Sequence, residues 1–161
     1  MLDSVLASAH DLLYRVAYSR YDVTAKSLAN AYSQAIGQVF TQEMKPLEVE
    51  ILVVEVGKNG SPNAMYHLLY DGTITDYKHF VVMGGAKEAA MALLEESYRD
   101  GMTLEEAIHL CSKALLKTNG NKQLSAETLE IAVLDKNKEG RQFKRIQADE
   151  VPKLLGNSGS A

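Results

Sequence analysis

The fold is decided by the stretch Met65-Tyr-His-Leu-Leu-Tyr-Asp-Gly-Thr-Ile-Thr-Asp-Tyr-Lys-His-Phe-Val-Val-Met-Gly-Gly85. Two runs rich in Tyr, Val, Ile and Phe flank Asp71-Gly72-Thr73, where the glycine supplies the positive φ of a tight turn. The second run stops at Gly84-Gly85, and from Ala86 to Asp100 the apolar period changes from 2 to 3.6. The stretch therefore predicts a hairpin, a tight corner and then a helix.

Upstream of this hairpin, the pattern predicts two helices and a strand. An amphipathic helix is expected over 2–16, and a second helix begins at a cap on Asp22 or Thr24 and ends before Pro46. The second helix has an apolar side made of Leu28, Tyr32, Ala35, Ile36, Val39 and Phe40. Residues 48–56 predict a strand that is apolar on both sides at its centre. The turn residues of 57–63 join it to the hairpin as an antiparallel meander.

Downstream, the pattern predicts a helical hairpin and a second pair of strands. Gly101 ends the helix over 86–100, and Thr103-Leu104-Glu105-Glu106 is a capping box that begins the next helix. The side of that helix expected to face inward consists of Leu104, Ala107, Ile108, Cys111 and Leu115. In the strand that follows, Leu129, Ile131 and Val133 alternate with polar or small residues, and 142–147 is its partner.

These elements predict an α+β layered architecture in a single domain over residues 1–161. A short helix is expected over 148–155, before a flexible Gly/Ser tail at 156–161. The sheet is covered by helices on one side and needs a second cover that this chain does not supply. We therefore expect the chain alone to aggregate or self-associate through the uncovered face of strands 48–56 and 78–83.

The bulk composition limits the class of function. A net charge of −4 gives no electrostatic reason to expect nucleic acid or an anionic membrane as a partner. The longest apolar run, Ile51-Leu52-Val53-Val54, is far too short to span a bilayer. A single cysteine, Cys111, cannot form an internal disulfide, and the residues from Met1 show no charged-then-apolar leader pattern, so export is not expected. The sequence is therefore interpreted as cytoplasmic.

A search for catalytic, cofactor or metal sites selects no residue. The histidines at positions 10, 67, 79 and 109 are scattered and lack metal-ligand spacing, and His67 and His79 are expected on the solvent or interface side of the hairpin. Cys111 lies on the apolar stripe of its helix, so we interpret it as a small buried hydrophobe. Gly84-Gly85 could hold an anion at a helix N-terminus, but close packing explains the glycines better. We interpret the acidic residues Glu95, Glu96, Asp100, Glu105 and Glu106 as a solvated helix face.

From about Tyr18 to Leu155 the sequence resembles proteasome α-type subunits, especially the actinobacterial kind. The matching stretches are Tyr18-Ser19-Arg20 with Asp22-Val23-Thr24, Ser27 to Tyr32, Lys45-Pro46 with Val49-Glu50, Tyr70-Asp71-Gly72, His79 to Gly85, Glu96-Ser97-Tyr98, Leu129 to Asp135, and Phe143 to Ile146. The series is collinear. Residues 1–17 match the family poorly, and an N-terminal third that the family has is missing here.

The resemblance implies a fold, a role and partners. The fold is the Ntn-hydrolase-like sandwich of helix, sheet, sheet and helix layers, here N-terminally truncated and therefore incomplete. The role is that of a structural, non-catalytic α-ring subunit of a bacterial 20S core particle, which gates substrate entry during protein degradation. The partners are other α-type subunits in a heptameric ring, catalytic β-type subunits, and an ATPase or other activator ring.

Two alternatives remain open. The chain could be a fragment of a catalytic β-type subunit, whose nucleophile is an N-terminal Thr, Ser or Cys with its own amine as base. This chain begins Met1-Leu2-Asp3, which offers no such nucleophile. The chain could instead be an unrelated small α+β module that binds an anion at the Gly84-Gly85 corner. A melting temperature that rises with phosphate would favour this module.

Overall fold

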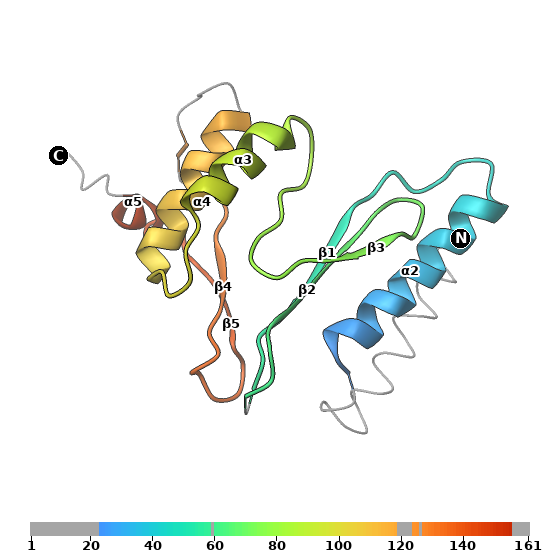
Figure 1. The fold of residues 1–161 in the computed structure, drawn as a ribbon, viewed down its shortest axis with the longest axis horizontal. Helices are drawn as coiled ribbons and strands as arrows, with labels where there is room; N and C mark the ends of the chain where they lie inside the picture. The colour runs from blue at the N-terminus through green and yellow to red at the C-terminus, as the bar shows by residue number, and fades with distance from the viewer. Residues whose placement is uncertain (1–22, 59, 119–123, 126, 156–161) are drawn as a thin grey trace. The chain divides into compact units, whose positions relative to one another are not determined.

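The computed structural model describes residues 23–58, 60–118, 124–125 and 127–155, which form two compact units (Figure 1). The first unit ends at His79 and the second begins at Phe80. The predicted helix over 2–16 and the tail at 156–161 lie outside the described residues. None of the helices that the structure describes is both long enough and apolar enough to cross a bilayer.

The first unit is a helix packed on a three-stranded antiparallel sheet. The helix, α2, spans Ala25–Gln42 and begins with the predicted cap on Thr24, whose side chain and backbone exchange hydrogen bonds with Ser27. The strands are β1 (Ile51–Glu55), β2 (Ala64–Leu68) and β3 (Ile74–Asp76), in the order β1-β2-β3. The predicted meander and its cap are therefore confirmed.

One face of this sheet forms the core of the first unit. The register pairs Val53 with Tyr66 and Ile51 with Leu68, so these four side chains lie on the same face. They pack against Ala25 and Ala29 of α2, and Leu68 is completely buried. The small residues of α2 allow the helix to approach the sheet closely.

The hairpin turn shows why Gly72 is required. Its φ is +86°, as the tight turn demands, and a Cβ there would lie 2.6 Å from the Ser33 carbonyl oxygen. The Ser33 hydroxyl donates a hydrogen bond to the Gly72 carbonyl oxygen. The turn is therefore fixed against α2 as well as closed on itself.

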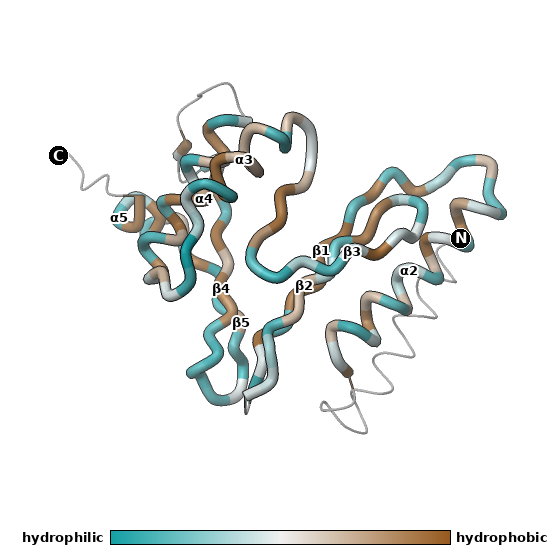
Figure 2. Tube along the Cα trace, in the orientation of Figure 1, coloured by the Kyte–Doolittle hydropathy of each residue, from teal (hydrophilic) through white to brown (hydrophobic). Residues whose placement is uncertain are grey.

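The strand predicted over 78–83 is absent, which corrects the interpretation of the opening stretch. β3 ends at Asp76, and the Tyr77 N–H continues the ladder by one bond, donating to the Met65 carbonyl oxygen at 2.9 Å. The hydrophobic segment that follows is visible between β3 and α3 in Figure 2. Phe80 and Val82 pack against a helical core in the second unit. Packing of these side chains therefore replaces strand pairing.

The second unit is a helical hairpin with a two-stranded antiparallel sheet and a short helix. Its helices are α3 (Lys87–Ser97), α4 (Leu104–Thr118) and α5 (Val151–Leu154), and its strands are β4 (Ala132–Leu134) and β5 (Phe143–Arg145). Ala90 and Leu94 of α3 pack against Leu110 and Ala114 of α4. The predicted α+β class, with helices and antiparallel sheets, is confirmed.

The inward side of α4 differs from the prediction. Ile108 is buried as expected, but Leu110, Ser112 and Ala114 are the other buried residues. Leu104 and Leu115, predicted to face inward, are 49% and 41% exposed. The reason is that α3 packs beside α4 on the Leu110 and Ala114 side, which leaves the predicted stripe facing the β4 segment.

Candidate functional site

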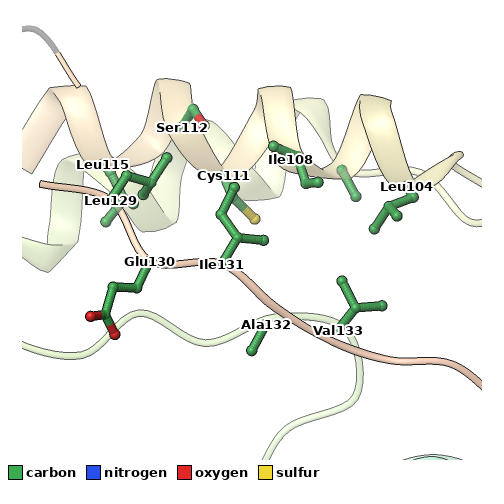
Figure 3. A pocket seen from close by; sticks show the side chains of 11 residues that line it. Leu104, Ile108, Cys111, Ser112, Leu115, Leu129, Glu130, Ile131, Ala132 and Val133 are labelled. Atoms are coloured by element: carbon green, nitrogen blue, oxygen red, sulfur yellow. The ribbon is translucent and has the colours of Figure 1, made fainter. Parts of the chain in front are cut away.

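The second unit carries an apolar groove between α4 and the segment leading into β4 (Figure 3). Its volume is about 300 Å³. One wall is the predicted stripe of α4, and the other carries Leu129, Ile131 and Val133 at alternate positions. In Figure 3 Leu104 lies toward Val133 and Leu115 toward Leu129, so α4 and this segment run in opposite directions.

The strand beneath the groove has an open edge. β4 pairs with β5 alone in the part of the chain that the structure describes. The Ile146 N–H donates to the Ile131 carbonyl oxygen at 2.9 Å, and the Asp135 N–H donates to the Gln142 carbonyl oxygen at 3.1 Å. Because backbone groups alternate along an antiparallel ladder, those of Ala132 and Leu134 point away from β5. This edge is a template for a further strand.

Cys111 lies on the groove wall and not in the core, which corrects the prediction. It is a free, exposed cysteine whose side chain opens into the groove. The surrounding groups exclude enough water to raise the pKa of its thiol above the usual range. The thiol is therefore held in its neutral form, the opposite of what a cysteine nucleophile needs.

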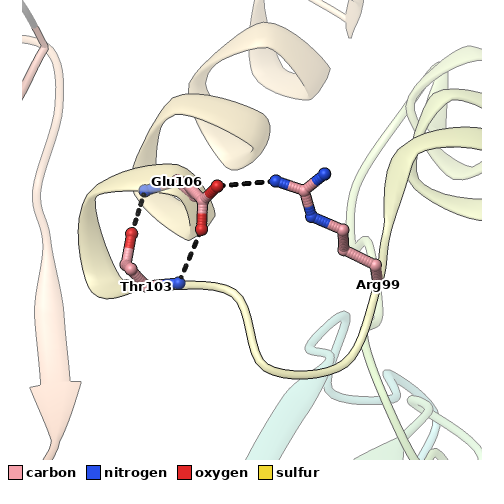
Figure 4. Close-up of polar contacts among 3 residues, drawn as sticks. All are labelled: Arg99, Thr103 and Glu106. Carbon is pink, nitrogen blue, oxygen red and sulfur yellow. Dashed lines mark hydrogen bonds and ion pairs between the residues drawn. The ribbon is translucent and has the colours of Figure 1, made fainter.

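The acidic residues around the α3–α4 corner have structural partners. Glu106 accepts a hydrogen bond from the Thr103 N–H at 2.8 Å, and Thr103 Oγ1 accepts one from the Glu106 N–H at 3.2 Å, which is the predicted capping box (Figure 4). Arg99 donates to Glu106 at 2.6 Å. The Thr103 N–H first, and then Arg99, lower the pKa of the Glu106 carboxyl. Glu106 thus holds the start of α4.

The other acidic residues of this cluster lie on the surface. Glu95, Glu96, Asp100 and Glu105 are exposed, and Asp100 accepts a hydrogen bond from the Tyr98 hydroxyl at 2.9 Å. That bond is the largest cause of the raised pKa of Tyr98. The interpretation of these carboxylates as a solvated face is confirmed.

His67 lies in a buried, polar environment on β2. It is 4% exposed and its Nε2 lies 2.9 Å from Glu50 Oε2. This buried position corrects the expectation that His67 lies on the solvent or interface side of the hairpin. His109 is exposed on α4, and His10 lies outside the described residues. Within the described ranges, no three His, Cys, Asp or Glu side chains gather where they could hold a metal ion.

The second face of the three-stranded sheet carries Leu52 and Val54, which are 40% and 38% exposed. Strand β1 is therefore covered by a helix on one face only, whereas the sequence predicted that both of its faces would be covered. The Glu50–His67 pair lies on this same second face, because Glu50 and Leu52 alternate with Ile51 and His67 pairs with Leu52. A polar pair thus interrupts the apolar area.

Backbone conformation explains Gly84, the first of the two glycines before α3, and close packing explains neither of them. Gly84 has φ +97°, and a Cβ added at Gly84 or Gly85 would meet nothing within 4 Å. The next residue, Ala86, is also left-handed at φ 55° and gives α3 no side-chain cap. The prediction of close packing at this corner is therefore wrong.

Sequence reasoning missed the groove as a surface, although it identified most of the residues that line it. The alternation of Leu129, Ile131 and Val133 and the helical stripe of α4 were both evident. The missing signal was the position of α3, since no local pattern shows which side of α4 its neighbour covers.

Comparison with known proteins places these features in a family. Residues 6–134 match the family model described as proteasome subunit. The chain is 40% identical over 151 residues to proteasome subunit alpha of Frankia alni, with 89% of the chain and 63% of that relative covered. It is 45% identical over 144 residues to the subunit of Streptosporangium roseum, covering 89% of the chain and 55% of the relative.

A third relative gives the same picture. Proteasome subunit alpha of Rhodococcus jostii is 44% identical over 144 residues, which cover 86% of this chain and 56% of that relative. The chain therefore spans between 55% and 63% of the length of these curated relatives.

Proposed function

The chain belongs to the proteasome subunit family, and on that premise we propose that it is a structural, non-catalytic α-type subunit of a bacterial 20S core particle. The observation that carries this proposal is the 40–45% identity to relatives that are all named proteasome subunit alpha. The role is in protein degradation, through the assembly of the particle and the gating of substrate entry.

The proposed partners are other α-type subunits in a seven-membered ring, catalytic β-type subunits, and an ATPase or other activator ring. The proposed compartment is the cytoplasm. The exposed apolar surfaces support a subunit role, since apolar area open to water in an isolated chain is typical of proteins that associate. These surfaces include Leu52 and Val54 on the sheet, and Leu104 and Leu115 beside the groove.

The test is to tag the full chain in its own host and purify it under native conditions. Co-purification with α-type and β-type subunits in a particle of ring size is the expected result, because a ring subunit is held by its neighbours. Mass spectrometry of the purified particle gives the composition. A chain that elutes apart from all other proteasome subunits, while those subunits still assemble, contradicts the proposal.

The non-catalytic part of the proposal is tested separately on the pure chain. We expect no turnover of fluorogenic peptides, because the Cys111 thiol is held neutral and no catalytic, cofactor or metal-binding residue is proposed. The matched control is Cys111→Ala, which should behave as the unchanged chain does. Turnover that disappears in this variant would assign a nucleophile to the groove, and turnover that persists would favour the β-type alternative.

A further inference from the structure

We draw no further inference here: the strongest candidate, the groove that Pro46, Glu48, Val49, Glu50 and Tyr70 line between the segment joining α2 to β1 and the hairpin turn, offers two carboxylates of which Glu50 is already paired with His67, and nothing in the structure shows what covers it.

Discussion

Helices α2 and α4 share the same design and have different surroundings. Each begins with a capping box on a threonine, Thr24 or Thr103, and each carries a stripe of apolar residues. Part of the stripe of α2, including Leu28 and Tyr32, packs on a sheet whose strands are consecutive in the chain, although Phe40 at its end is 42% exposed. The predicted stripe of α4 faces an open groove, while a neighbouring side of α4 packs on α3.

The comparison shows that periodicity locates an apolar stripe but does not say whether anything covers it. Ala29 of α2 is 1% exposed because β1 and β2 lie across it. Leu104 of α4 is 49% exposed although its sequence position is equally suited to a core. The same substitution should therefore lower the free energy of unfolding much more in the core beneath α2 than along the groove beside α4.

The largest expected effect is that of Leu68→Ala beneath α2. Leu68 is completely buried, and deletion of its side chain leaves a cavity that the helix and sheet cannot close fully. We expect the free energy of unfolding to fall by about 2–5 kcal/mol, measured by urea denaturation. Leu52→Ala on the opposite face is the control and should cost about 1 kcal/mol or less. Equal losses would show that both faces are covered.

Ile108→Ala and Leu115→Ala test the two sides of α4. Ile108 is 7% exposed, so its truncation should cost about 2 kcal/mol, near the lower end for core residues because the groove beside it is already open. Leu115 is 41% exposed, and its truncation should cost about 0.5 kcal/mol or less. A cost for Leu115 that matches that of Ile108 would mean that the groove is filled in the monomer.

The two threonine caps should contribute equally, whatever covers their helices. Thr24→Ala and Thr103→Ala each remove a side-chain acceptor for a backbone N–H in the first turn. We expect a loss of about 1 kcal/mol for each, measured by thermal unfolding. Serine at either position retains the acceptor and serves as the control. A much larger loss at one threonine would show that it has contacts besides the cap.

The smallest expected effect is a pH dependence at the start of α4. The folded-state pKa of Glu106 is lowered, so its carboxylate stabilises the cap above its unfolded-state pKa. This contribution is lost as the pH falls through the lower, folded-state pKa. Hydrogen exchange at the first turn of α4 should therefore become faster in acid. Glu106→Gln should remove most of this dependence, and an unchanged profile would contradict the assignment.

Local patterns predicted most of the fold because local chemistry determined it. The Thr24 and Thr103 caps, the Gly72 turn and the two antiparallel units all follow from residues close together in the chain. The strand over 78–83 could not be rejected in the same way, since its apolar side chains suit both a sheet and a helical core. Only the position of α3 and α4 decides between the two.

The candidate surfaces were predicted less completely for a related reason. The sequence identified Cys111 as part of an apolar stripe, but its exposure depends on which side of α4 the chain covers. Likewise, His67 was expected on an open side of the hairpin, and its burial beside Glu50 depends on strand register. Both properties arise from contacts between elements and not from any one element.

The contact between Ser33 and Gly72 also has a consequence for synthesis of the chain. The two residues are 39 positions apart, so α2 cannot dock until the hairpin turn has been made. At about 5–20 residues per second, the ribosome takes about 2–8 s to add that length. During this interval the apolar side of α2 has no sheet to cover it. The apolar side of α2 is therefore open to aggregation until the turn has been translated and the sheet can form against it.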